Sequence, residues 1–381
     1  MMQSFKTQVS SSPPTIRKRY HEFDLLRGIS ILFMVACHVL ETYNSFIAEH
    51  VLTEIHWIYY SYAVIGPSAL MIALGANLAF SHNHSPSKLI KRGLTFLLLD
   101  FGLNIVRTVV PCVACTSLGY DGYMSYAFCE ILRSDIYAFV GAFFLLFALF
   151  THLRLGPFVI LNITILMTGF NTAIEYFHLL PVNNVYLSAF LSRFFWMDDS
   201  SFFSLFSWSI FPAIGYYFGK HFQQLNAAGQ RQLAYRMLSI CSTVFISFLI
   251  FLANRGYSLD IASLPLNDYK TDPFGAILMI LLTGIVWSLL HLFVSRFPNC
   301  SFTKPILVLS KHVVPYYLIQ WIIILWLCYP LELVCNRILF HSTLSFYLFV
   351  LLIIISSIGL SILISKKMSV RKQKPVQSHL G

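Results

Sequence analysis

The sequence predicts an all-α fold, that of a polytopic integral membrane protein with about ten transmembrane helices. Hydrophobic residues make up 57% of the 381 positions, charged residues only 11%, and the mean hydropathy is +0.70. Apolar runs of about 18 residues or more recur along the chain. Because so few charged side chains could cover a water-soluble core, these observations exclude a soluble globular domain.

The expected helices follow the apolar runs in order, several of which are interrupted by Gly, Pro or a single polar residue. These runs are 25–46, 57–80, 92–111, 133–151, 156–176, 202–219, 233–253, 273–295, 305–328 and 344–365. The segment 177–201 is less regular, since Phe194, Phe195 and Trp196 can form an interfacial or re-entrant helix there. Such a helix would add one further element to the bundle.

The distribution of Lys and Arg predicts both termini in the cytoplasm, because these residues collect in cytoplasmic loops. With the N-terminus inside, 20 of the 26 basic residues fall on the cytoplasmic side. The others lie at outer helix ends or in outer loops: Arg107, Arg133, Arg193, Arg255, Lys270 and Arg337. The formal net charge of +10 follows from this topology, so no nucleic-acid partner is expected.

We expect one transmembrane domain, 24–366, between two basic cytoplasmic tails, 1–23 and 367–381. The first helix keeps charged residues and has no small-residue cleavage site, so a removable signal peptide is not expected.

The cysteines do not predict a metal site. Cys112, Cys115, Cys129 and Cys335 fall near or beyond the outer face, where an oxidising compartment permits a disulfide. Cys112 and Cys115 resemble half of a zinc site, but no second pair has the matching spacing. A loop disulfide and free thiols are the two interpretations, and the pairing is undetermined.

The first helix carries the most informative residues, Arg27 and His38, eleven positions apart. Eleven α-helical steps leave both side chains on one face, about 16 Å apart. The same face carries Asp24 one turn before Arg27 and Glu41 one turn after His38. Ionisable groups at such depth usually line a solvated or substrate-filled cavity, although a lone membrane His is more often hydrogen-bonded to a neighbouring helix.

Other polar residues have two interpretations, one structural and one functional. His56 precedes Trp57 at the start of the second helix, where it is either part of an interfacial aromatic belt or catalytic. Lys91 and Arg92 are either cytoplasmic anchors or ligands of a phosphate-rich molecule. Asp100 and Asn104, one turn apart on the third helix, could orient a partner or hydrate a cavity.

The run from Arg19 to His38 resembles the opening of the transmembrane acyltransferases. It is most similar to the group built around the catalytic domain of heparan-α-glucosaminide N-acetyltransferase, with the bacterial acyltransferase-3 family as a sibling. Further similarities, in the same order and spacing, are Gly66-Pro67 to Gly75, Lys91-Arg92-Gly93, Phe211-Pro212 to Tyr216, Leu309-Ser310-Lys311-His312 and Tyr316-Tyr317 to Gln320.

The chain also departs from the pattern of these relatives. Gln320 stands where relatives often have a His, so the resemblance assigns no catalytic duty to that position. The animal glucosaminide enzyme has Asn at the position of His38 and places its catalytic His near His56. The two branches therefore nominate different histidines; we expect His38 to be catalytic and retain His56 as the competitor.

The resemblance implies transfer of an acetyl group from acetyl-CoA to a hydroxyl or amine of an extracytoplasmic glycan or glycolipid. Arg27, Lys91 and Arg92, with Asp24 beside them, would bind the donor, while His38 would act as general base supported by Glu41. A membrane transporter or flippase for an anionic lipid or small anion is the alternative, although the two halves of the chain show no convincing similarity. We expect membrane lipids around the helices and a bacterial inner membrane location. O- versus N-transfer, acyl chain length and homodimer formation are left open.

Overall fold

The computed structural model describes residues 19–81, 85–119, 124, 127, 131, 134–180, 184–195, 202–255, 273–334 and 337–373, without the side chains of 56–64 and a few others. Its elements in chain order are α1 (His21–Tyr43), η1 (Asn44–Phe46), α2 (Glu49–Ala79), α3 (Pro86–Asn104), η2 (Ile105–Val109), α4 (Val110–Ser117), α6 (Ile136–His152), α7 (Pro157–Tyr176), α8 (Val185–Leu191), α9 (Leu205–Trp208), α10 (Ile210–Phe222), α11 (Ala227–Asn254), α12 (Pro273–Arg296), α13 (Thr303–Lys311), α14 (Val313–Val334) and α15 (Thr343–Gln373). The expected all-α class is confirmed, since the described residues form no strand and only isolated bridge residues, such as the pair Ile47 and Phe340.

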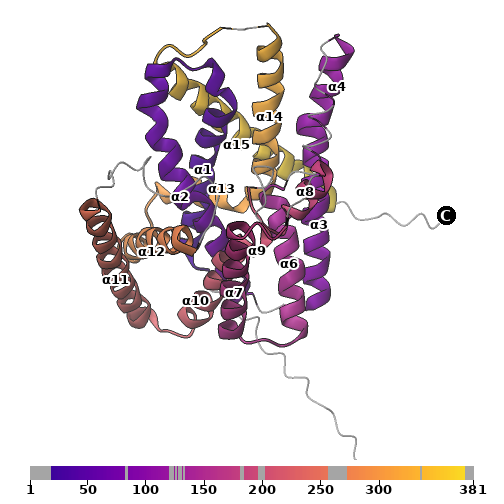
Figure 1. Cartoon of the computed structure of the whole chain (residues 1–381). Helices are drawn as coiled ribbons and strands as arrows, with labels where there is room; N and C mark the ends of the chain where they lie inside the picture. Colours follow the sequence, from indigo (N-terminus) through magenta and orange to yellow (C-terminus); the bar gives the residue numbers. More distant parts are fainter. Residues whose placement is uncertain are drawn as a thin grey trace, which may run out of the picture.

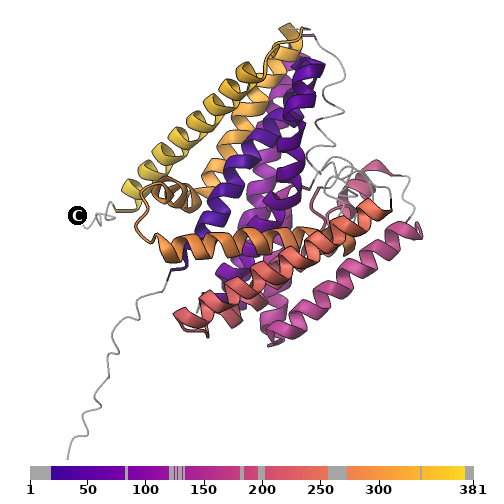
Figure 2. The ribbon, with the colours of Figure 1, turned by 90° about the vertical axis from the view of Figure 1, so that its left-hand side faces the viewer.

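Helix α1 is the centre of the bundle. It packs against α2, α12, α13, α14 and α15. In its most apolar 18-residue stretch, 72% of the residues are buried inside the protein, compared with 11% in the corresponding stretch of α11. Figure 1 shows α11 at one edge of the molecule, and Figure 2 shows α11 and α12 running obliquely across the lower part of the upright helices. The helix that carries Arg27 and His38 is therefore enclosed by helices from most of the chain.

Seven helices in the described part are long and apolar enough to cross a membrane: His21–Phe46, Pro86–Ser117, Pro157–Tyr176, Ala227–Asn254, Gly275–Arg296, Val313–Glu332 and Thr343–Lys367. Two shorter apolar helices, Ile65–Ala79 and Ile136–His152, accompany them. A multi-pass membrane protein is thus supported. The number of about ten spans and the orientation of the termini stay predictions.

Three of the expected helices are divided in the structure. The run 305–328 breaks at His312 into α13 and α14, because Pro315 lacks the backbone N–H that would continue the first helix. The run 202–219 comprises the short α9 and α10, which meet at Ser209. The run 92–111 belongs to a longer helix, 86–117, in which a π-helical turn, η2, separates α3 from α4.

Glycines set the crossing of α2 and α10. A Cβ on Gly75 would overlap the carbonyl oxygen of Pro212, and one on Gly215 would overlap that of Ile72. Only the absence of a side chain at both positions allows the two backbones to touch. Helix α2 also packs against α1, where it forms part of the wall of the cavity described below.

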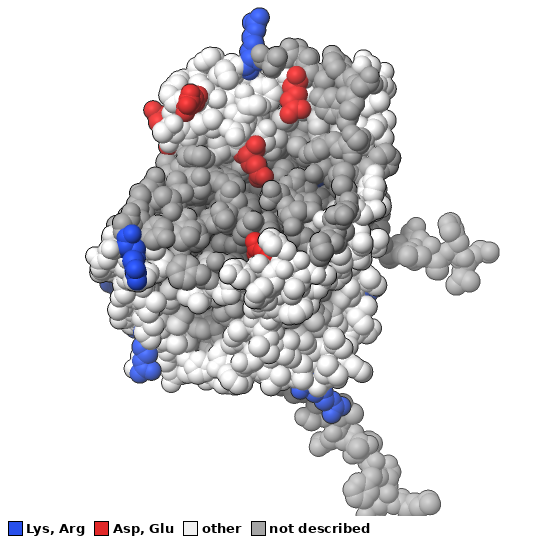
Figure 3. All heavy atoms as spheres, in the orientation of Figure 1, with Lys and Arg blue, Asp and Glu red and all other residues white. Residues whose placement is uncertain are grey.

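The outer surface of the bundle is apolar. Large aliphatic side chains on α15, such as Leu352, Ile355 and Leu363, are each more than half exposed, and α11 presents a similar face. Figure 3 shows few charged side chains on the described surface of one side of the molecule. Extended apolar surfaces of this kind would be unfavourable in water and are suited to contact with lipid.

Candidate active site around His38

His38 lies on the inward face of α1, against one turn of α14. Its Nδ1 is 3.1 Å from the side-chain amide nitrogen of Gln320. The imidazole stacks on Trp321 at a centroid distance of 4.1 Å and meets the ring of Tyr317 edge-on at 6.2 Å. These three contacts come from positions three and four residues apart on α14, which share a helix face. The ring is held on several sides but is still partly exposed.

A buried ion pair lies next to these aromatic rings. The Nη1 of Arg107 donates to Oδ2 of Asp135 at 2.7 Å, and both side chains are almost fully buried. The guanidinium carbon of Arg107 lies 4.8 Å from the centre of the Trp321 ring, so the cation contacts the same indole that stacks on His38. The Tyr317 ring packs against Tyr137 of α6 at a centroid distance of 4.6 Å, two residues after Asp135. The imidazole is thus one ring away from a fixed pair of charges.

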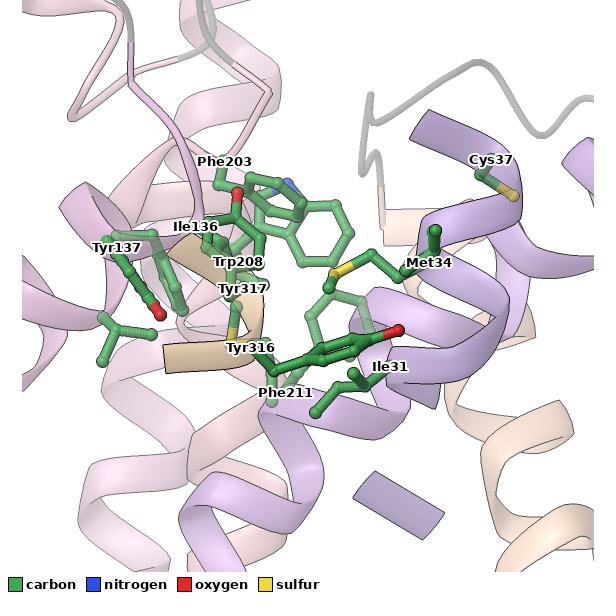
Figure 4. Packing of buried hydrophobic residues seen from close by; sticks show 14 of the residues in the cluster. Ile31, Met34, Cys37, Ile136, Tyr137, Phe203, Trp208, Phe211, Tyr316 and Tyr317 are labelled. Carbon is green, nitrogen blue, oxygen red and sulfur yellow. The ribbon is translucent and has the colours of Figure 1, made fainter. Parts of the chain in front are cut away.

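A cavity of about 160 Å³ extends along the predicted face of α1. Arg27, Ile31 and Met34 line it at the spacing of successive helical turns, and Tyr317 forms part of its opposite wall. Figure 4 shows Ile31 and Met34 on the side of α1 that faces Tyr316. His38 itself is not part of the lining, but its ring contacts that of Tyr317, which is. The predicted common face therefore holds a hollow, which is mainly apolar and ends one aromatic ring before His38.

Arg27 is tied to the surrounding helices. Its Nη2 donates to Oδ1 of Asp24 at 2.8 Å and lies 3.4 Å from Oγ of Ser310 on α13. The other oxygen of Asp24 accepts from Arg19 at 2.5 Å. One buried carboxylate therefore holds two guanidinium groups, which leaves a net positive charge beside the cavity. Asp24 thus forms an ion pair with Arg27, and its donor-binding role stays a prediction.

Lys91 and Arg92 lie exposed on α3. The Arg92 guanidinium lies 5.8 Å from the centre of the Phe144 ring, and Phe144 stacks on Phe96, which lines the cavity. Arg92 is thus connected to the outside of the cavity wall through two aromatic rings. The structure places Arg92 near the cavity that holds Arg27, on a different helix.

A family model described as heparan-alpha-glucosaminide N-acetyltransferase, catalytic, matches residues 19–256, which include the ion pair and the greater part of the cavity lining. The chain belongs to this family. The match covers well over half of the chain and confirms the resemblance seen in the opening motif. No curated protein and no solved structure gives a significant match to the chain. Membership of this acetyltransferase family, together with the helices, indicates an acetyltransferase-type membrane enzyme.

The two other predicted catalytic residues of this family member are placed differently from His38. Glu41 lies one turn further along α1 and is exposed. The side chain within hydrogen-bonding distance of the His38 ring is that of Gln320. His56 lies within α2, but its side chain is outside the described part of the structure. The structure therefore leaves the roles of Glu41 and His56 as predictions.

The sequence interpretation of this acetyltransferase missed the Arg107–Asp135 pair. Arg107 was counted among the basic residues at outer helix ends, because its segment reads as an ordinary helix terminus. The π-helical turn Ile105–Val109 that holds it has no clear sequence signature. A charged residue within the run Pro86–Ser117 was the available signal, since such residues are costly in a membrane span.

Among the described cysteines, Cys115, Cys241, Cys300 and Cys328 are free thiols. Cys129 and Cys335 lie outside the described residues. Cys112 and Cys115 are buried in a small apolar cluster with Tyr329, and the choice between a loop disulfide and free thiols stays open for Cys112.

Proposed function

We propose that this protein transfers an acetyl group from cytosolic acetyl-CoA to a hydroxyl or amine of an extracytoplasmic glycan or glycolipid. Its family supports acetyl transfer. The observation that carries the proposal further is the cavity beginning at Arg27 and ending at Tyr317, which contacts His38. A cation, an apolar cavity and, in contact with the Tyr317 ring at its wall, an imidazole follow one another along α1.

The donor would enter with its phosphates at Arg27. A guanidinium donates several hydrogen bonds in a fixed plane and suits phosphate oxygens, and Arg92 and Lys91 add positive charge on α3. The pantetheine arm is long and mostly apolar, as is the cavity lined by Ile31 and Met34. The separation of about 16 Å between Arg27 and His38 along α1 is of the order of that arm.

His38 would act as general base. The acceptor hydroxyl or amine attacks the thioester carbonyl carbon, the carbon–sulfur bond breaks, and the acceptor proton passes to His38 and then to the leaving thiolate. This step requires a free lone pair on Nε2, so Nδ1 must carry the proton and Gln320 must accept it. The Gln320 carbonyl oxygen is buried without a hydrogen-bond partner in the described part, so a turn of the amide would satisfy it.

The test is acetyl transfer from radiolabelled acetyl-CoA by the purified protein in proteoliposomes. Glucosamine is a suitable acceptor probe because it offers both an amine and hydroxyls, and mild alkali releases acetyl from esters but not from amides. His38→Ala should lower kcat by about 10²–10⁴, the usual contribution of a general base. His50→Ala is the matched control, since His50 is exposed and bonded only to the His341 carbonyl among the contacts described.

The outcomes separate the alternatives. Full activity of His38→Ala with loss in His56→Ala would transfer the catalytic role to the second helix. Failure to form any labelled product, with an unmodified anion or lipid crossing the bilayer instead, would support the carrier over the enzyme.

A further inference from the structure

Arg107 is aimed into the protein by an irregularity of its helix. It lies in the π-helical turn Ile105–Val109, between α3 and α4. An extra residue in one turn shifts the following side chains by about 100° around the helix axis. Val106 and Val110 on either side are exposed, whereas Arg107 is 5% exposed. Single π-turns in α-helices are frequent at functional sites, so the backbone itself marks Arg107.

The partner of Arg107 is equally fixed. Asp135 precedes the first residue of α6, and its Oδ1 accepts from the backbone nitrogen of Ile136 at 2.6 Å. Its Oδ2 accepts from Arg107, so each carboxylate oxygen is engaged. An ion pair inside a membrane-spanning bundle is expensive to desolvate and is seldom kept for stability alone. The same helix cap would form with Asn or Ser at this position, which leaves the charge of Asp135 without a structural explanation.

The pair reaches His38 through one ring of α14. Arg107 lies 4.8 Å from the centre of Trp321, and Trp321 stacks on His38 at 4.1 Å. Tyr317, whose ring meets His38 edge-on, packs against Tyr137 at 4.6 Å, two residues after Asp135. Because Trp321 contacts both the guanidinium and the imidazole, a shift of Arg107 would change the surface on which His38 rests. The stacked indole beneath His38 is thus held directly by this ion pair.

We infer that Arg107 and Asp135 are positioning residues that hold the imidazole of His38 in its catalytic orientation through Trp321. This inference rests on the proposed function and deepens it. Neither residue of the pair is among those that line the cavity, although Asp135 accepts from the backbone nitrogen of Ile136, which is. Removal of the pair should therefore affect the chemical step and leave donor binding unchanged. A displacement of the base by about 1 Å is sufficient to cost on the order of 10²-fold in rate.

The experiment compares steady-state kinetics of the full-length protein in proteoliposomes. The double variant Arg107→Gln/Asp135→Asn removes both charges at once, so no unpaired charge is left buried. We expect kcat to fall by on the order of 10²-fold, with the KM for acetyl-CoA within about twofold of wild type. Arg107→Lys keeps the charge but loses the planar stack on Trp321. Its kcat should therefore lie between that of the wild type and that of the double variant. Thermal unfolding and size-exclusion profiles report whether each variant is folded.

A mutant cycle tests the route. If the pair acts through Trp321, adding Trp321→Leu to the double variant should cause little further loss, because both changes release the same ring. Arg255→Gln is the matched control: Arg255 also lies over an aromatic ring, Phe251, but at the exposed end of α11. It should leave kcat and KM unchanged.

Several results would overturn the inference. A folded double variant with wild-type kcat, a loss confined to KM, or fully additive losses with Trp321→Leu would each do so. If the double variant does not fold, a wild-type kcat in Arg107→Lys would also overturn the inference. Failure of the proposed base is seen separately, as full activity of His38→Ala, and failure of the proposed transfer reaction as absence of labelled product in the wild-type protein.

Discussion

Gln320 on α14 places its side-chain amide 3.1 Å from Nδ1 of His38 on α1, across 282 positions of sequence. This contact joins two of the motifs of the acyltransferase resemblance in one site. Because a neutral imidazole has one donor and one acceptor nitrogen, the partner of Nδ1 decides which nitrogen faces the substrate. Gln320 is therefore placed to select the tautomer of His38, and the proposed base form requires its amide oxygen toward Nδ1.

Replacement of Gln320 should separate its hydrogen bond from its volume. Gln320→Leu keeps a similar size without an acceptor, and we expect kcat to fall on the order of 10²-fold through loss of the base orientation. Gln320→Glu retains an acceptor for the Nδ1 proton and should be less impaired. The measurement is kcat for acetyl transfer by both variants. Equal activity of Gln320→Leu and wild type would contradict this role.

Arg27 should control the affinity for the donor. Arg27→Ala removes charged hydrogen bonds, each worth about 1.5–3 kcal/mol, so the KM for acetyl-CoA should rise by about 10- to 100-fold. Asp24 would stay paired with Arg19, so the helix end should remain ordered. The assignment is checked with desulfo-CoA that lacks the 3′-phosphate, used as an inhibitor. The affinity of this inhibitor should depend less on Arg27 than the affinity of acetyl-CoA does. A rise in the acceptor KM alone would argue against it.

Filling the cavity should block the donor. Leu70 lines the cavity from α2, and Leu70→Trp would fill much of its volume of about 160 Å³. We expect kcat/KM for acetyl-CoA to fall at least tenfold, about 1.4 kcal/mol in transition-state binding, with the protein still folded. Phe33→Trp is the matched control, because Phe33 on α1 is 50% exposed. Equal effects of the two tryptophans would show that the cavity is not the donor passage.

The crossing of α2 and α10 should tolerate no side chain at Gly75. Gly75→Ala places a Cβ against the Pro212 carbonyl oxygen, and such overpacking costs about 1–3 kcal/mol or more. A lower unfolding temperature in detergent is the expected result. Gly169→Ala on α7 meets no atom within 4 Å and should be neutral or slightly stabilising, since Ala favours helix. An unchanged unfolding temperature for Gly75→Ala would mean that the helices can separate at no cost.

Local sequence was sufficient for the helices and for part of the site. Apolar runs mark where a chain must satisfy its backbone groups by helical hydrogen bonds in lipid, so all of the expected ranges contain helix. The common face of Arg27 and His38 follows from helical periodicity alone, and the cavity lies along it. The sequence analysis expects one helix over 305–328 and misses its division at His312. Hydropathy measures only how apolar the residues are, so it does not reveal that Pro315 interrupts the helical hydrogen bonds.

What the sequence determined by itself is therefore the all-helical membrane class and one polar helix face, because composition and periodicity are properties of neighbouring residues. The family followed from the resemblance of its motifs. The tertiary structure alone decided what meets that face: Gln320, Trp321 and the Arg107–Asp135 pair. These residues come from α14, η2 and the start of α6, far from His38 in sequence. Their convergence depends on helix packing and on one π-helical turn, and neither is encoded in any short stretch of the chain.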